Sequence, residues 1–332
     1  MKITIYDVAK KANVSTATVS KVINETGKIS EATREKVKAI INELGYRPSL
    51  IASALMTKKT ATIGLLIPDI TNPYFSEVAR QIDDCCRNND YSLTFCNTDN
   101  DEAKTSEYID LLLQKGVDAL IISAQIKDAS IIKNLLEQKV PVLLFATSIS
   151  DLDVNTVIVD EYDGTAMAVE HLVSEGCENI CFVGGKGIER NSNKTRAYYD
   201  VTRKYGLKVC EMTIDQSNSA ILRNKEELGA IFDLQPDIDG IFACSDLAAI
   251  GVLKEAQKRE IKIPGALKIV GFDNTMFTEL TTPEISTVAQ PIADMAKQGL
   301  DILVKNINDL NFKPQKIIFT PKLIIRASSA II

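Results

Sequence analysis

The side chains that could carry catalysis show no spacing that suits a familiar reaction. His171 is the only histidine of the sequence, so a Ser/His/Asp relay or a multi-histidine metal site would depend on one imidazole. The seven cysteines form no C-x-x-C pair, and GGKG at 184–187 lacks the spacing of a phosphate-binding loop. We therefore expect no enzyme, no metal site and no bound cofactor.

Side chains suited to binding a small polar ligand are more frequent. Aromatic residues, carboxylates, hydroxyls and arginines follow several apolar runs, and such a mixture suits a sugar or a nucleobase. The candidates are Asp69, Asn72, Tyr74, Phe75, Arg190, Ser192, Arg196, Ser245, Asp246 and Asp273. A structural role competes at each position, since Asp246 could cap a helix and Asp273 could stabilise a turn.

A second binding chemistry is indicated near the amino terminus. Thr16 and Lys21 could read the edges of DNA bases, and Ala17 could contact a thymine methyl group, if all three lie on a helix that enters the major groove. The competing interpretation is a three-helix bundle with a solvated polar face.

Positive charge is concentrated in the same part of the chain. Residues 1–60 contain eleven Lys and Arg against five Asp and Glu, a net charge of +6, whereas the remaining 272 residues carry −12. This asymmetry predicts that only the amino-terminal part contacts a polyanion.

Helix signals place these residues. Thr4 and Asp7 form a T-x-x-D capping box, Ser15 is expected to cap a helix over 16–24, and Ser30 a helix over 31–43 that Gly45 ends. Two short helices joined by about three residues, with a third completing the core, match the helix-turn-helix plan. The apolar positions of the predicted core are Val8, Ala9, Ala12, Val19, Val22, Ile23, Val37, Ile40, Ile41 and Leu44.

The segment after residue 46 is short and apolar. Pro48 suits the start of a helix that would run to about Met56. A helix of about eight residues is marginal in water, so it needs a partner or a groove. An ordinary linker is the alternative.

From residue 61 onward, apolar runs alternate with helical patterns. Strands are predicted at 63–67, 91–96, 119–123, 140–146, 156–160, 179–185, 240–244 and 268–272, and one of the helices at 74–89. This alternation predicts parallel sheets with helices on both faces, in two lobes because some 270 residues are too many for one sheet. Ligands of such sheets bind outside the carboxyl ends of the strands.

Nothing in the sequence predicts a membrane or secreted protein. No run of eighteen apolar residues occurs, and the amino terminus has no apolar signal segment. The odd number of cysteines fits free thiols in a reducing cytoplasm. We expect a cytoplasmic protein with no membrane partner.

The first fifty residues resemble the DNA-binding headpiece of the LacI/GalR family. TIYDVAKKANVSTATVSKVIN at 4–24 follows the family pattern at nearly every fixed position, and ISEATREKVKAIINELGYRPS at 29–49 continues it. The resemblance implies that Thr16, Ala17 and Lys21 contact bases of double-stranded operator DNA. It also assigns phosphate contacts to Tyr6, Ser15, Thr18, Ser20 and Asn24.

The resemblance extends into the next segment. It makes residues 47–60 a hinge helix that pairs with its twin in a homodimer. Leu55 stands where the family inserts a leucine into the minor groove, and Ala52 stands at the close contact between the two hinge helices.

The rest of the chain resembles the family's periplasmic-binding-protein-like core through IPDITNPYFSEV, GFDN and TVAQP. The implied fold is α/β: a two-lobed core of parallel sheets (61–332) preceded by a small all-α helix-turn-helix domain (1–46). The N-lobe would comprise about 61–158 and 290–318, and the C-lobe about 159–289 and 319–332. Arg196, Asp246 and Asp273 match frequent effector positions, and Arg190 and Ser192 match a purine-binding branch.

The expected function is a dimeric repressor of metabolic genes. Its affinity for a pseudo-palindromic operator would be set by a small effector (a sugar, a sugar derivative or a purine) between the lobes. One alternative is a regulator controlled by a phosphoprotein corepressor, as in one branch of the family. The other is a solute-binding protein, which the headpiece and the lack of a secretion signal argue against.

Overall fold

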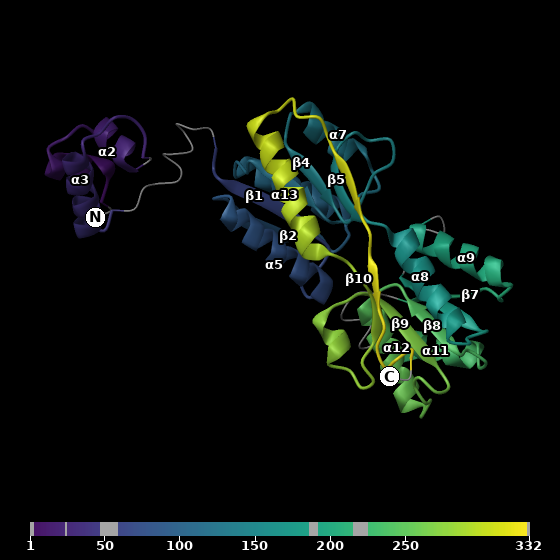
Figure 1. The fold of residues 1–332 in the computed structure, drawn as a ribbon. Helices are drawn as coiled ribbons and strands as arrows, with labels where there is room; N and C mark the ends of the chain where they lie inside the picture. The colour runs from purple at the N-terminus through teal and green to yellow at the C-terminus, as the bar shows by residue number, and fades with distance from the viewer. Residues whose placement is uncertain (1–2, 24, 47–58, 186–191, 215–224, 331–332) are drawn as a thin grey trace. The chain divides into compact units, whose positions relative to one another are not determined.

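Figure 1 shows the chain as a computed structural model, which describes residues 3–23, 25–46, 59–185, 192–214 and 225–330. The chain forms two compact units, Met1–Ala61 and Thr62–Ile332. Within the described residues, no helix is both long and apolar enough to cross a membrane.

Three helices build the described part of the first unit. α1 (Ile5–Ala12) follows the Thr4–Asp7 capping box, α2 (Thr16–Ile23) follows a short turn, and α3 (Glu31–Leu44) lies between a Ser30 cap and Gly45. The predicted helices are confirmed, with α3 one residue longer than expected. Their shared core contains Val8, Ala9, Ala12, Val19, Val22, Val37 and Ile40.

Two six-stranded sheets form the second unit. Sheet A has the order β11-β5-β4-β3-β1-β2 and is parallel throughout. Its strands are β1 (Thr62–Ile67), β2 (Ser92–Asn97), β3 (Ala119–Ile122), β4 (Val142–Phe145), β5 (Asn155–Val159) and β11 (Lys316–Phe319).

Sheet B has the order β12-β10-β9-β8-β6-β7. It is parallel except where β12 runs antiparallel to β10. Its strands are β6 (Ile180–Gly185), β7 (Cys210–Ile214), β8 (Gly240–Ala243), β9 (Lys268–Asp273), β10 (Ser286–Ala289) and β12 (Lys322–Ile324).

Helices cover both faces of each sheet. On sheet A, α5 (Pro73–Asn88) and α13 (Ile292–Asn308) pack against one face, and α6 (Glu102–Gln114) and α7 (Ser130–Glu137) against the other. On sheet B, one face carries α8 (Glu161–Ser174) and α9 (Asn193–Tyr205), and the other carries α11 (Lys225–Leu234) and α12 (Asp246–Lys258). A short 3₁₀ helix, η1 (Met276–Glu279), follows β9.

Each sheet with its helices forms one lobe, called here the N-lobe (sheet A) and the C-lobe (sheet B). Among the described residues, the chain passes between them after β5, after β10 and between β11 and β12, and Figure 1 shows the last of these passages as the yellow strand segments. The carboxyl ends of β1 and β9 lead directly into segments 68–75 and 274–280.

All eight predicted strands are present, within two residues at each end. Four further strands, β7, β10, β11 and β12, escaped the sequence analysis. β7, β11 and β12 are short and lie at or next to a sheet edge, where side chains are partly exposed. β10 is buried but reads Ser-Thr-Val-Ala, which lacks the apolar run expected of a central strand.

Candidate DNA interface and ligand site

The predicted reading face of α2 points away from the core of the first unit. Ala17 and Lys21 are exposed and Thr16 is half-buried, whereas Val19 and Val22 are fully buried. Since residues four apart share one side of a helix, Ala17 and Lys21 lie together on the side opposite the core, and the half-buried Thr16 lies at the border of that side. The amino-terminal turn of α2 is therefore presented outward, as a recognition helix requires.

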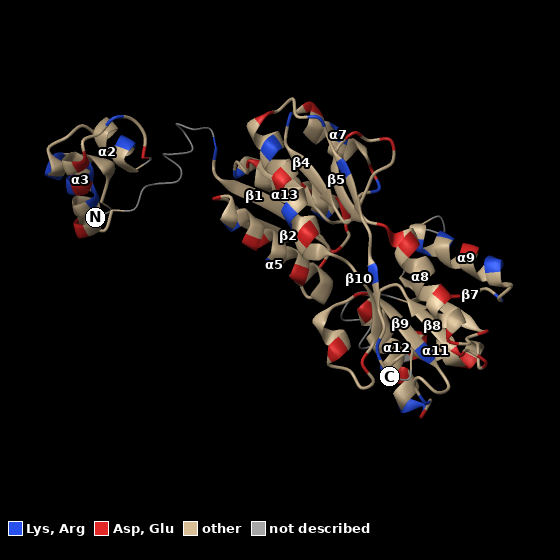
Figure 2. Cartoon of the chain, in the orientation of Figure 1, with Lys and Arg blue, Asp and Glu red and all other residues tan. Residues whose placement is uncertain are grey.

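The side chain of Lys21 extends over Gly27, and its ammonium stays unpaired among the charges of the described residues. Gly27 has φ of +73°, and a Cβ atom built there would lie 3.3 Å from Cδ of Lys21, so the lysine stem crosses Gly27. Both signs of charge occur on this unit (Figure 2): Lys11 pairs with Glu43 and Lys38 pairs with Glu25. Lys21 forms no ion pair with any described residue, so its ammonium is available to a base or a phosphate.

The predicted phosphate contacts are also accessible where the structure describes them. Tyr6 is 74% exposed. Ser15 Oγ accepts a hydrogen bond of 3.1 Å from the backbone N–H of Thr18 and lies 2.9 Å from Thr18 Oγ1. This cap keeps both hydroxyls at the start of α2, where the helix dipole favours a phosphate. Ser20 is half-buried. The predicted contacts Asn24, Ala52 and Leu55 lie outside the described residues.

On the N-lobe, the candidate ligand residues surround the start of α5. Asp69 Oδ1 accepts from the N–H of Thr71 at 2.9 Å, and Asn72 Oδ1 accepts from the N–H of Tyr74 at 3.0 Å. Tyr74 is only 7% exposed and meets Phe75 edge-on, with ring centroids 5.0 Å apart. Asp69 and Asn72 thus shape the turn that places the two aromatic rings.

On the C-lobe, Ser245 and Asp246 form bonds within the protein. Ser245 caps α12 by accepting from the N–H of Ala248. The fully buried Asp246 accepts from Thr287 Oγ1 at 2.5 Å and from the N–H of Thr275 at 2.6 Å. Burial raises the pKa of Asp246 to about 6, against the lowering effect of these donors. Asp246 therefore joins β10 to the start of η1.

Gln290 links the two lobes. It lies directly after β10, and its Nε2 donates to Asp273 Oδ1 at 2.8 Å while its Oε1 accepts from the Tyr74 hydroxyl at 3.3 Å. Asp273, at the carboxyl end of β9, is 9% exposed. Burial raises the pKa of its carboxyl well above the usual range, and nearby Lys194 partly opposes that rise. Two predicted ligand residues from different lobes therefore meet through one amide.

Lys194 is a site residue that the sequence analysis missed. Its side chain is 12% exposed, its Nζ donates to the carbonyl of Cys244 at 3.1 Å, and it lies 3.4 Å from Glu161 Oε1 and 3.8 Å from the centroid of the Phe272 ring. Burial alone would lower the pKa of this ammonium, but the carboxylates of Glu161 and Asp273 outweigh it and raise that pKa. The lysine thus provides a buried positive charge beside Asp273.

The remaining candidates lie around α9. Ser192 caps this helix by accepting from the N–H of Thr195. Arg196 is exposed, with its guanidinium 5.9 Å from the centroid of the Tyr162 ring. Arg190 lies outside the described residues. The structure therefore brings Tyr74, Asp273 and the unpredicted Gln290 and Lys194 together, whereas Ser192 and Ser245 serve as caps.

Sequence signals existed for both missed residues. Lys194 lies in the first turn of α9, where the helix dipole disfavours a cation. A lysine at that position indicates a contact with a group outside its own helix. Gln290 is the polar residue directly after a strand. Neither signal says what the side chain contacts.

The described residues hold no catalytic arrangement around the histidine. His171 Nε2 lies 2.7 Å from Ser329 Oγ, and burial lowers its pKa. Within those residues, no group of three or more His, Cys, Asp or Glu side chains is placed to hold a metal ion.

Comparison with known proteins decides the family. A model of the bacterial regulatory proteins of the lacI family matches residues 4–49, and a periplasmic binding protein-like domain matches residues 169–329. The HTH-type transcriptional regulator DegA of Bacillus subtilis is 35% identical over 334 residues, covering 99% of each chain. The chain belongs to the LacI family. Catabolite control protein A of Staphylococcus xylosus is 33% identical and covers 99% of this chain and 100% of its own.

Solved structures agree. A periplasmic binding protein/LacI transcriptional regulator from Alkaliphilus metalliredigens, complexed with D-xylulofuranose, is 31% identical, with a TM-score of 0.72 over 82% of this chain and 100% of its own. The lac repressor dimer bound to operator and ONPF shares the fold, with a TM-score of 0.88 at 22% identity over all of both chains. The predicted α/β fold with an amino-terminal helical domain is confirmed. This LacI-family chain is a DNA-binding transcriptional regulator and not an enzyme.

Proposed function

We propose that this LacI-family regulator is a homodimeric repressor whose affinity for a pseudo-palindromic operator is set by a small effector held between its lobes. The observation that carries the proposal is the amide of Gln290, which bonds Tyr74 of the N-lobe and Asp273 of the C-lobe. A ligand that contacts either partner acts on the link between the lobes.

The DNA-binding part of the proposal rests on exposure. Thr16, Ala17 and Lys21 read bases, and Tyr6, Ser15, Thr18 and Ser20 position the phosphates, with Asn24, Ala52 and Leu55 assigned from the family pattern. Lys21 acts as a point charge on its base, since lysine lacks the planar fork of arginine. We infer a cytoplasmic location, because a bacterial operator is found there.

Exposed apolar side chains support a dimer. Met276, Phe277 and Leu280 in and after η1 are 67%, 43% and 70% exposed, and Phe95 on the edge strand β2 is 49% exposed. The three neighbouring side chains at η1 form one exposed apolar segment, and such a segment marks an interaction site. The related lac repressor was solved as a dimer on its operator. A twofold dimer presents two headpieces to two half-sites, which is why the operator would be pseudo-palindromic.

The effector is a small polar molecule with an apolar face. Tyr74 and Phe75 offer aromatic surface, and Asp273 accepts hydrogen bonds from hydroxyl or N–H groups, which suits a sugar, a sugar derivative or a purine. The relative from Alkaliphilus metalliredigens was solved with D-xylulofuranose. Coupling between ligand and operator would be about 1–3 kcal/mol, and the operator must change effector affinity by the same factor.

We assign residues 1–46 to the headpiece, 47–60 to the hinge and 61–332 to the core. The N-lobe would take about 61–158 and 290–318, and the C-lobe about 159–289 and 319–332.

The test selects a duplex from a random pool with the full-length dimer, then measures affinity for it by fluorescence anisotropy with and without sugars, sugar acids, sugar phosphates and purines. We expect a preferred, inverted-repeat duplex and one compound class that changes its affinity. Affinity that responds only to a phosphorylated protein would favour the corepressor mechanism instead. Ligand binding without preference for any duplex would contradict the proposal and favour a solute-binding protein.

A further inference from the structure

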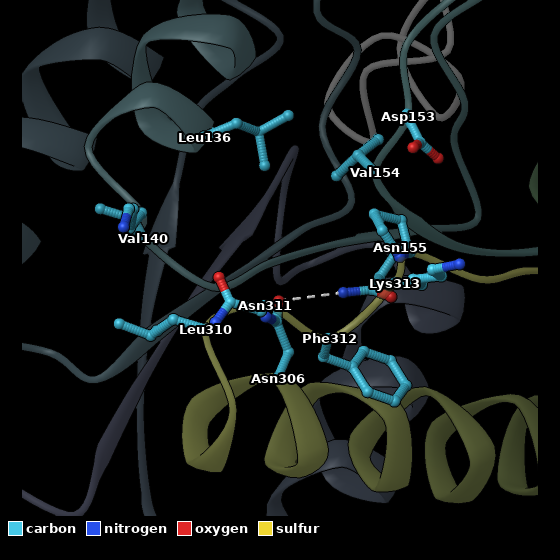
Figure 3. Close-up of a pocket in the computed structure, with 12 residues that line it drawn as sticks. Leu136, Val140, Asp153, Val154, Asn155, Asn306, Leu310, Asn311, Phe312 and Lys313 are labelled. Atoms are coloured by element: carbon cyan, nitrogen blue, oxygen red, sulfur yellow. Dashed lines mark hydrogen bonds between the residues drawn. The ribbon is translucent and has the colours of Figure 1, made fainter.

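A cavity of about 300 Å³ lies in the N-lobe, far along the strands from the ligand site described above (Figure 3). Its walls come from the end of α7, the segment between α7 and β4, the start of β5, the end of α13 and the loop that precedes β11. Because the strands of sheet A are parallel, these segments lie at the amino edge of the sheet, opposite the carboxyl edge that carries Tyr74. The volume is at the lower end of the range for small-molecule sites.

The charged groups that line this cavity are two lysines and one carboxylate. Lys139 and Lys313 are both exposed at its rim, and neither ammonium forms an ion pair or a hydrogen bond with any described residue. Asp153 is the one carboxylate among the lining residues. The lining thus carries a net positive charge whose two ammoniums are not satisfied within the described protein.

A buried amide orients a third donor. Asn155 is 2% exposed, and its Oδ1 accepts from the N–H of Gln315 at 3.1 Å. Its Nδ2 therefore donates to Asn306 Oδ1, at 3.1 Å, as the dashed line in Figure 3 shows. With its oxygen engaged, Asn306 has an NH₂ group whose only contact within the described residues is a long one, 3.5 Å to the carbonyl of Asp309.

The backbone at Lys139 is in a conformation that lysine does not favour. Its φ is +57°, in the left-handed region, at the position after α7 where glycine is the usual residue. A non-glycine residue there costs about 1 kcal/mol. The same conformation follows α5 at Asp90 and α12 at Glu260, so at Lys139 it sets the direction in which the backbone leaves α7 along the cavity wall.

Apolar side chains complete the wall. Leu136, Val140 and Phe312 are half-buried, and Leu310 is 53% exposed. Figure 3 shows Leu136, Val140 and Leu310 on the side of the cavity away from Asp153.

We propose that this cavity binds a small organic anion that carries an apolar group next to its acidic group. Lys139, Lys313 and Asn306 hold the acidic group, and Leu136, Val140 and Leu310 cover the apolar group. This is a second ligand site of the regulator, separate from the site between the lobes.

The test uses phenyl phosphate as the probe on the full-length protein, with ¹³C-labelled leucine and valine methyl groups observed by NMR. Saturable shifts are expected at Leu136, Val140, Val154 and Leu310, and inorganic phosphate should bind more weakly because it lacks the ring. The double variant Lys139→Gln, Lys313→Gln should weaken phenyl phosphate binding by at least about tenfold. Asp153→Asn should strengthen binding, because it removes the like charge.

Lys133→Gln, on the exposed side of α7, is the matched control, since it removes one positive charge outside the cavity. It should leave binding unchanged. The proposal is overturned if the cavity methyl groups do not shift, or if Lys133→Gln weakens binding as much as the double variant does. It is also overturned if Asp153→Asn, which does not depend on the double variant being folded, fails to strengthen binding. No operator is used, so failure here leaves the proposed function untouched.

Discussion

The link through Gln290 predicts a pH-dependent loss of stability in the isosteric variant Gln290→Glu. In the wild-type chain, Nε2 of Gln290 donates to Asp273 Oδ1 at 2.8 Å. The substitution replaces this donor with a carboxyl oxygen of nearly the same size. Two carboxyl groups then face each other at hydrogen-bond distance in a site where Asp273 is 9% exposed.

The sign of the effect follows from linkage. Burial already raises the pKa of Asp273, and a second carboxylate raises it further, so the pair retains one proton that the unfolded chain releases. A group whose pKa is higher in the folded state contributes full stability below its unfolded pKa and loses it as the pH rises through the folded pKa. A buried acceptor that loses its donor costs about 1–3 kcal/mol, and more where the acceptor is charged, so we expect a loss of about 3 kcal/mol at the alkaline end. Lys194, beside Asp273, reduces this loss.

The assay is urea unfolding of wild type and Gln290→Glu between about pH 4.5 and about pH 8. The two free energies of unfolding should be similar at the acidic end and diverge as the pH rises. Gln298→Glu, at an exposed position of α13, adds the same charge to the lobe and should follow the wild-type curve. Parallel curves for wild type and Gln290→Glu would mean that Gln290 and Asp273 are not in contact in solution.

Three predictions concern DNA. Lys21→Ala should cost about 1–3 kcal/mol at one base pair of the operator, measured against single-base operator variants, and a uniform loss over all sequences would instead make Lys21 a phosphate contact. Leu55→Ala should weaken operator binding far more than random-sequence binding in the same anisotropy assay, and equal losses would contradict insertion into the minor groove. Deleting residues 1–60 should abolish DNA binding but leave a dimer in light scattering, whereas a monomer would place the dimer interface in the deleted part.

Local signals made much of the fold predictable. The caps at Thr4 and Ser30 and the spacing of Val19 and Val22 define the headpiece helices, because capping and periodicity act over a few residues. Continuous apolar runs define the central strands for the same reason. β10 was missed because its burial depends on distant partners: Ser286 donates to the carbonyl of Arg326, and Thr287 donates to Asp246.

The candidate ligand site was also predictable only in part, because local sequence does not show which distant residues meet there. Asp246 and Asp273 were both identified as candidates because they follow predicted strands. Their position did not predict which hydrogen-bond partners each carboxylate would have. Asp246 accepts from Thr287, which follows it by 41 residues, and Gly271 on β9 gives it room, since a Cβ there would lie 2.6 Å from Asp246 Oδ1. Asp273 instead accepts from Gln290 and is influenced by the nearby charge of Lys194. Roles that depend on such long-range pairs are not written in local sequence.

These contacts also suggest how a ligand bound at Asp273 would change the connection between the two lobes. An effector hydroxyl that bonds to Asp273 must either share the carboxylate with Gln290 or displace its amide, and displacement also removes the partner of the Tyr74 hydroxyl. Because Gln290 lies where the chain passes from β10 to α13, its displacement acts on a connection between the lobes. Lys194 is held by Cys244 and Glu161 within the C-lobe, so its positive charge stays near Asp273 when Gln290 moves. Under the proposed function, effector binding and lobe arrangement would then be alternatives at one carboxylate, which is the differential contact that allosteric coupling requires.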